Sequence, residues 1–159
     1  MQNYLPSWQR AAQLRDLYLE QAPWFFGAVT ERQLNEEVLP LFYEEAADEV
    51  RARIHMGVTT GSSGPGELGN SAEAFHLPTT NTQPTSHDLA LIFVVFCFGA
   101  LTDPAMPPAP HNEEATRYYQ LTRAALSLEP VLDRSPSMTT VQTLSLMGIY
   151  QVRPRILYA

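Results

Sequence analysis

The sequence contains no lysine, so all 10 of its basic residues are arginine, and 17 acidic residues outnumber them. The arginines are dispersed along the chain, and the formal net charge is −7 at pH 7. Surfaces that bind nucleic acid are normally basic and cluster their positive charge. The composition therefore argues against DNA binding by this chain itself.

Cysteine is almost as scarce, because Cys97 is the only one. A single cysteine excludes a disulfide framework and leaves a thiol-based zinc site without enough ligands. Cys97 lies inside an apolar run, so we interpret it as a small buried hydrophobe and not as a nucleophile. The chain also lacks a signal peptide and any Asn-x-Ser/Thr acceptor, and an intracellular protein is the expectation.

Sequence patterns typical of enzymes are missing too. Residues 61–69, GSSGPGELG, lack the G-K-[S/T] ending of a phosphate-binding loop. Ser86, His87 and Asp88 are adjacent, whereas a catalytic triad is assembled from separated positions. We therefore expect no enzyme activity, no catalytic residue, no metal site and no cofactor. We interpret the acidic run Glu44, Glu45, Asp48 and Glu49 as a solvated helix face. The four histidines are scattered and are interpreted as unrelated positions: His55, His76, His87 and His111.

Helical periodicity is the strongest pattern that is present. Asn112 fits an N-cap, and Glu113 and Glu114 follow where a helix N-terminus favours negative charge. Pro130 is expected to end this helix, because the residue before a proline is disfavoured in the α conformation. Along one face of this helix, residues suited to burial recur at helical spacing and are expected to pack inward: Ala115, Tyr118, Tyr119, Thr122, Ala125 and Leu126.

A second amphipathic helix follows this one after a short turn. Ser135 fits its N-cap and Pro136 its first helical position. The two helices together predict an αα-hairpin, which is a packing unit and not an active site. The residues at helical spacing along one face of this helix are expected to pack on the first helix of the pair: Val141, Leu144, Ser145, Gly148, Ile149 and Val152. Ser145 and Gly148 are small, so they allow another helix to approach closely there.

Three further helices are expected upstream. Pro23 should stop the first, Thr30 and Gln33 form a capping-box pattern at the second, and Pro40 should kink or divide that helix. The run Leu89–Leu101 is too short for a membrane span, and by period alone it fits either a strand or a helix. Its length and an expected N-cap at Ser86 favour a buried helix. Gly99 would then lie where another helix approaches closely. The predicted helices are 6–21, 30–54, 87–101, 112–129 and 136–152.

These elements predict an all-α fold of antiparallel helical hairpins that forms part of a larger helical domain. Between them, a segment rich in Gly, Ser, Thr and Pro has too little apolar surface to offset the entropy of ordering. The chain is therefore divided into an N-terminal helical segment, a flexible insert, a helical core segment and a divergent tail: 1–56, 57–86, 87–152 and 153–159.

The final helical pair resembles the middle regulatory region of fungal zinc-cluster transcription factors, the xylanolytic-activator type of regulatory domain. RYYQLTRAALSLEPVLDR followed by PSMTTVQTLSLMGIYQ is similar to that family's two helices. DLYLEQAPWFFGAVTERQL and SHDLALIFVVFCFGALTD resemble its first segment and its buried helix, so the likeness covers roughly 14–151 without the insert. The second helix matches the form "pSlxTVQaLlLxaxYq" at Pro136, Ser137, Thr140, Val141, Gln142, Leu144, Leu146 and Tyr150.

The resemblance implies a nuclear, all-α module that takes part in regulating DNA-templated transcription through helix packing. Its implied partners are other proteins, the missing helices of the same domain, or a second copy in a homodimer; DNA would be reached only through a separate domain, and no membrane is involved. The family-motif core positions that it implies are Tyr118, Tyr119, Leu121, Leu126, Val141, Gln142, Leu144 and Tyr150.

The sequence departs from this family twice. The six-cysteine zinc cluster that contacts DNA is absent, so the family's zinc and DNA functions fall on no residue here. After Gln151 the chain reads VRPRILYA, where Pro154 is expected to interrupt the helix and the family's further helices are missing. The chain therefore resembles a truncated regulatory domain.

One alternative from another class stays open. An independent α-helical scaffold, similar to tetratricopeptide repeats, would bind peptides on a concave face without any link to transcription. Against this alternative, the sequence shows no self-similarity near the 34-residue period that such repeats need. An enzyme is a distant third reading.

Overall fold

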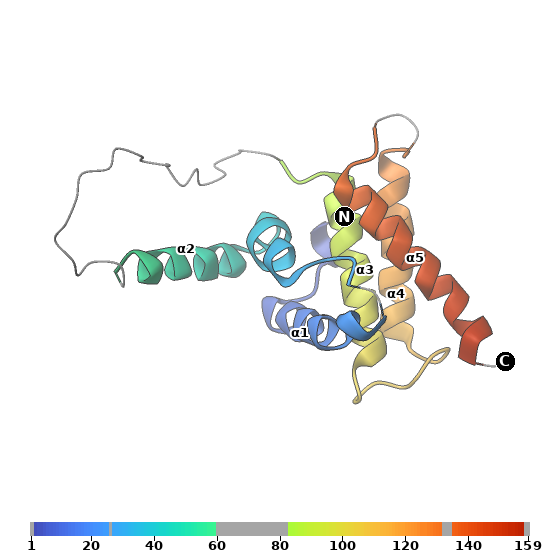
Figure 1. Ribbon diagram of the computed structural model, residues 1–159. Helices are drawn as coiled ribbons and strands as arrows, with labels where there is room; N and C mark the ends of the chain where they lie inside the picture. The colour runs from blue at the N-terminus through green and yellow to red at the C-terminus, as the bar shows by residue number, and fades with distance from the viewer. Residues whose placement is uncertain (1, 26, 60–82, 132–134, 158–159) are drawn as a thin grey trace.

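The computed structural model describes residues 2–25, 27–59, 83–131 and 135–157, and among these residues no β-strand forms. The predicted all-α fold class is therefore confirmed. Figure 1 shows α3 flanked by α1, α4 and α5, with α2 pointing away from this bundle. The elements are η1 (Gln2–Tyr4), α1 (Trp8–Phe25), the π-helix η2 (Gln33–Val38), the 3₁₀ turn η3 (Leu39–Leu41), α2 (Glu44–Thr59), α3 (Ser86–Thr102), α4 (Glu113–Leu128) and α5 (Met138–Leu157).

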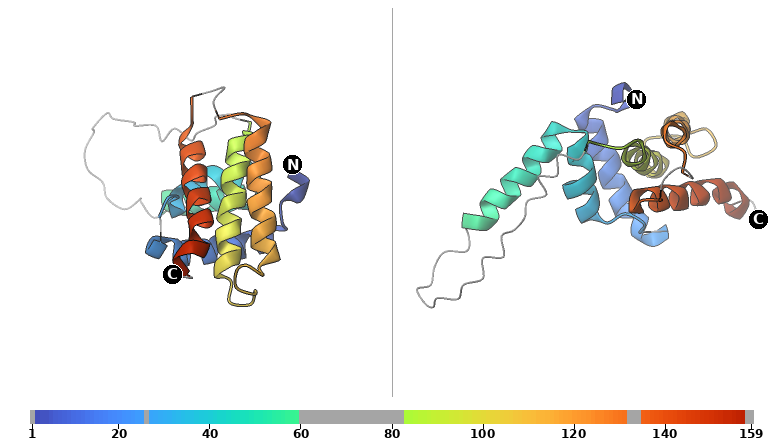
Figure 2. Two further views of the ribbon diagram at one scale, coloured as in Figure 1. Left: turned by 90° about the vertical axis from the view of Figure 1, so that its right-hand side faces the viewer. Right: turned by 90° about the horizontal axis from the view of Figure 1, so that it is seen from above.

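Helix α3 forms the centre of the core. Every residue from Leu89 to Cys97 is buried, as the apolar run predicts. A helix that is apolar on all sides must be covered on all sides, and α1, α4 and α5 pack around it (Figure 2). The choice of a buried helix over a strand for this run is confirmed.

Two contacts hold α1 against the end of α3. A Cβ atom added to Gly99 would clash with the main chain of Leu14, so the predicted close approach at this glycine is confirmed. The guanidinium of Arg10 binds the Asp103 carboxylate at 2.9 Å and donates from Nε to Glu114 Oε1 at 3.1 Å. Arg10 therefore ties α1 both to the end of α3 and to the first turn of α4.

The helix starts confirm one predicted cap and correct two. Asn112 caps α4, because its Oδ1 accepts from the Ala115 N–H at 2.9 Å. The cap of α3 is Thr85 and not Ser86: the Thr85 hydroxyl accepts from the Asp88 N–H, and the Asp88 carboxylate accepts from the Thr85 N–H. At the start of α5, Ser137 accepts from the Thr140 N–H at 3.2 Å. The predicted Ser135 cap is therefore wrong by two residues.

The prolines act differently from one another. Helix α4 ends at Leu128, before Pro130 as predicted, and Pro40 divides the predicted 30–54 helix into η2, η3 and α2. Pro23 and Pro154 do not stop their helices, because α1 runs to Phe25 and α5 to Leu157. Each of these two prolines lies within a turn of the C-terminal end of its helix, so only a few helical residues follow the hydrogen bond that the proline removes.

Helices α4 and α5 differ in how well the sequence predicts their buried faces. All six stripe residues of α4 are buried. In α5 the predicted stripe faces outward, with Val141 50% and Leu144 44% exposed. The face that packs on the bundle is the opposite one, which contains Thr140, Thr143 and Leu146.

The edges of the predicted insert also differ from expectation. The described residues stop at Thr59, resume at Gln83 and leave the middle of 57–86 outside. Helix α2 includes the first insert residues through Thr59, and Thr85 and Ser86 already belong to the start of α3. The acidic run in α2 is exposed, as expected: Glu44, Glu45, Asp48 and Glu49.

Candidate functional site at the α3, α4 and α5 junction

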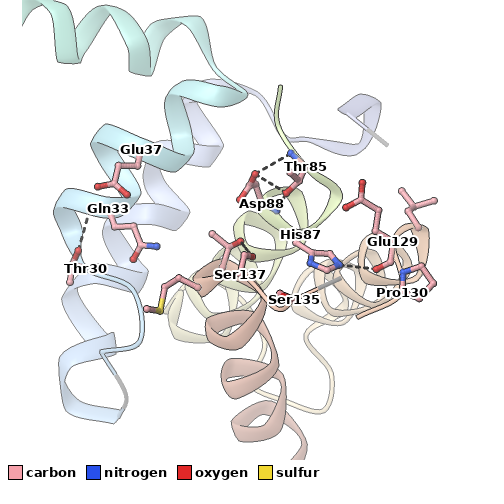
Figure 3. Close-up of a pocket in the computed structure, with 13 residues that line it drawn as sticks. Thr30, Gln33, Glu37, Thr85, His87, Asp88, Glu129, Pro130, Ser135 and Ser137 are labelled. Carbon is pink, nitrogen blue, oxygen red and sulfur yellow. Dashed lines mark hydrogen bonds between the residues drawn. The ribbon is translucent and has the colours of Figure 1, made fainter. Parts of the chain in front are cut away.

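A cavity lies where α3 begins, α4 ends and α5 begins. Its volume is about 980 Å³, and residues before and within η2 form one side of it (Figure 3). The connector between α4 and α5 forms the opposite side. Leu128, Pro130 and Met138 give the lining an apolar part. The residues of the lining that have a carboxylate or a hydroxyl are Glu37, Asp88, Glu129, Thr30, Thr85, Ser135, Ser137 and Thr139.

His87 joins the three helices at this cavity. Its Nε2 donates to the main-chain carbonyl of Glu129 at 2.8 Å, and its Nδ1 lies 2.7 Å from the Thr140 hydroxyl (Figure 3 shows the first bond). A carbonyl oxygen only accepts, so Nε2 holds a proton, and the Thr140 hydroxyl is the partner of Nδ1. The side chain is 9% exposed. With both nitrogens engaged, His87 acts as a link between helices and not as an available base.

Asp88 is also engaged by its own helix start. Its Oδ2 accepts from the Thr85 N–H at 3.0 Å and from the Thr85 hydroxyl at 2.8 Å. The first turn of α3 therefore holds the carboxylate in place at the cavity wall (Figure 3). Ser86, His87 and Asp88 thus stand in the first turn of α3, where His87 contacts Glu129 and Thr140 and Asp88 contacts Thr85.

Gln142 connects α5 to the segment that precedes η2. Its Nε2 donates to the Ala28 carbonyl at 2.7 Å. The Gln142 and Gln33 amides also pair, with each Nε2 lying 2.8 Å from the other's Oε1. Thr30 holds the start of that segment, because its hydroxyl accepts from the Gln33 N–H at 3.2 Å. The predicted capping box is therefore half formed, since the Gln33 side chain turns to α5 instead.

The structure brings together some of the family-motif positions and separates others. Tyr119 stacks on Tyr150 with 4.2 Å between ring centroids, and its hydroxyl accepts from the Gln151 amide at 2.6 Å. Tyr118 packs on Phe93 and Phe96 of α3. Of the remaining positions, Leu126 is buried and Leu121 half-buried, whereas Val141 and Leu144 lie outside the core.

The groups with displaced pKa values lie outside the lining of this cavity. Burial, aided by the charge of Glu114, raises the pKa of Tyr118 to about 12. Burial likewise raises the pKa of Tyr18 to about 12. At Asp103 burial opposes ionisation, but the Ala105 N–H and the Arg10 guanidinium hold its pKa below the ordinary value. These groups stabilise the packing of α1, α3 and α4.

Among the described residues, no three His, Cys, Asp or Glu side chains lie close enough to hold a metal ion. Among the same residues, no helix has both the length and the apolar character of a membrane span.

Sequence reasoning did not predict the contacts that His87, Thr140 and Gln33 make at this junction. A lone histidine and a glutamine give no signal of their own, since their partners lie 42 or more residues away in the chain. Thr140 and Gln142 belong to the T-V-Q motif quoted above, which is the sequence signal for these two residues. The motif does not say which residues they contact.

Comparison with protein-family models, curated proteins and solved structures found no match to this chain. The resemblance to fungal zinc-cluster regulators therefore stays a prediction that rests on the quoted motifs.

Proposed function

We propose that this chain is a regulatory helical module of the fungal zinc-cluster transcription-factor type, which acts in the nucleus through helix packing. The observation that supports it best is the junction at the start of α5. His87 links α3 to both neighbouring helices, and Gln142 links α5 to the Ala28–Gln33 segment. A change at the cavity would therefore act on α3, α4 and α5 together.

Helix α5 is the element that such a change would move. The inward face of α5 combines polar and apolar groups, because Thr140 and Thr143 lie there beside Leu146, Met147 and Tyr150. Polar contacts have strict geometry, so a displacement of α5 breaks them together and favours two discrete positions over a continuum. In this proposal, regulation consists of shifting the balance between the two positions, and contact with DNA belongs to a separate domain.

A reporter fusion tests the proposal. The chain is placed between a heterologous DNA-binding domain and an activation domain, and reporter output is compared with that of a flexible linker of equal length. We expect the chain to change the output at equal protein level. Gln142→Leu should remove most of this change, because it breaks the contacts to Ala28 and Gln33. Arg123→Ala, on the exposed face of α4, is the matched control.

Two results would contradict the proposal. The first is an output equal to that of the linker, and the second is an effect that Gln142→Leu leaves intact in a folded variant. The coding sequence on both sides gives an independent check, since the proposal expects a six-cysteine cluster upstream and further helices downstream. Specific peptide binding by the isolated chain, with neither of those flanks, would favour the scaffold alternative.

A further inference from the structure

Helix α5 has an uncharged apolar face on its outer side. We call this the α5 outer face, and it consists of Met138, Val141, Leu144, Ser145, Gly148, Ile149 and Val152. Met138 is 70% exposed, Val141 50% and Val152 49%. No charged residue occurs anywhere from Met138 to Val152. Helix α5 lies at the edge of the bundle, with α3 and α4 on its inner side (Figure 2).

Gly148 lies in the middle of this face, and no contact among the described residues accounts for a glycine there. A Cβ atom added there would meet nothing within 4 Å, whereas a Cβ on Gly99 would clash with the main chain of α1. Glycine weakens a helix relative to alanine, so a glycine in mid-helix is expected where another main chain approaches closely. At Gly99 that approach is visible, and at Gly148 none of the described residues makes it.

We propose that the α5 outer face binds the same face of a second copy of this chain, with the two α5 helices antiparallel. A two-fold axis between Leu144 and Ser145 places Val141 of one copy against Gly148 of the other. The same axis places Leu144 against Ser145. At the centre of the contact, Val141 and Leu144 then each meet a small residue of the other copy, as a self-complementary interface requires. This inference depends on the surface of α5 alone and not on the regulatory proposal.

Charge favours this face over the rest of the surface for self-association. The chain has a net charge of −7, so two copies repel each other over most approaches. The outer face brings no like charges into contact, because residues 138–152 contain none. A partner recognised by opposite charge would find nothing to pair with on this face.

The size of the face sets the strength of the contact. Residues 138–152 extend over roughly 22 Å at 1.5 Å per residue. One helix face of that length is smaller than the roughly 800 Å² per partner of a standard stable interface. We therefore expect a reversible dimer with a dissociation constant in the micromolar range.

Sedimentation equilibrium of the full 159-residue chain over a wide concentration range measures this association. We expect a monomer–dimer equilibrium. Leu144→Asp should raise the dissociation constant by roughly tenfold or more, because it places a charge at the centre of the contact. Ile54→Asp in α2 is the matched control, since Ile54 is 43% exposed and Leu144 44%. The control should leave the constant unchanged.

A charge pair tests the register. Leu144→Asp and Ser145→Arg should each weaken self-association, but an equal mixture of the two variants should form a heterodimer, because the introduced carboxylate of one copy then faces the introduced guanidinium of the other. Gly148→Gln should also weaken the dimer while the helical circular-dichroism signal is kept. A monomer at all concentrations, larger assemblies, equal effects of the α2 control, or no rescue in the mixture would each overturn the proposal.

Discussion

Helices α4 and α5 were predicted by the same reasoning, yet only α4 buries the predicted face. Helix α4 has Glu113, Arg117 and Arg123 on the side away from its stripe, so only one face is suited to the core. Helix α5 has no charged residue from Met138 to Val152, and both of its faces tolerate burial. Periodicity therefore identifies which residues share a face, and charge on the opposite side identifies which face turns inward.

Specific partners decide the orientation of α5. The Thr143 hydroxyl bonds to the Thr139 carbonyl at 2.7 Å, and Thr140 bonds to His87, so both threonines are buried with their hydroxyls satisfied. Tyr150 stacks on Tyr119 of α4. The contacts to His87 and Tyr119 join residues far apart in sequence, and no local pattern in α5 contains them.

The largest expected effect contrasts two leucines of α5. Leu146 is 1% exposed and Leu144 is 44% exposed. Leu146→Asp should lower the free energy of unfolding by about 3–5 kcal/mol, because it buries an unpaired charge in place of a packed side chain. Leu144→Asp should change it by less than about 1 kcal/mol. Urea unfolding at a concentration where the chain is monomeric measures both, and the reverse order would show that the predicted stripe faces inward after all.

The two glycines sharpen the contrast between a covered and an uncovered helix surface. Gly99→Ala should destabilise the fold by about 1–3 kcal/mol, because its Cβ would press on the main chain of Leu14. Gly148→Ala should stabilise the monomer by about 0.5–1 kcal/mol, since the site is open and alanine favours the helix. Thermal unfolding followed by circular dichroism separates the two, and a loss at Gly148 would point to a close contact within the monomer.

The helix starts provide a smaller comparison. Asn112 is 2% exposed, and besides capping α4 its Nδ2 donates to the Ala100 carbonyl at 2.7 Å. Asn112→Ala should therefore cost about 2 kcal/mol, through the lost cap and an unpaired carbonyl. Ser137→Ala at the exposed start of α5 should cost about 0.5–1 kcal/mol. Equal losses in urea unfolding would mean that α5 depends on its cap as strongly as α4 does.

Sequence reasoning went furthest where the signal was local. It found the all-α class, the Asn112 cap, the buried helix at Leu89–Leu101 and the close contact at Gly99, because each follows from neighbouring residues. It missed the inward face of α5 and the partners of His87, which depend on how distant helices meet. Two caps were displaced by one or two residues, since several Ser and Thr residues in succession can each accept the same N–H groups.

A last comparison concerns alkaline pH and the buried stripe of α4. Burial raises the pKa of Tyr118 to about 12, above its ordinary value near 10. A raised pKa in the folded state means that the contribution to stability is complete below about pH 10 and is lost as pH rises through about 12. Tyr118→Phe should remove only part of this decrease in the free energy of unfolding with rising pH, because Tyr18 also has a raised pKa. Urea unfolding at about pH 8, 10 and 11 in both variants measures it, and a pH dependence that the substitution leaves unchanged would assign the loss to other groups.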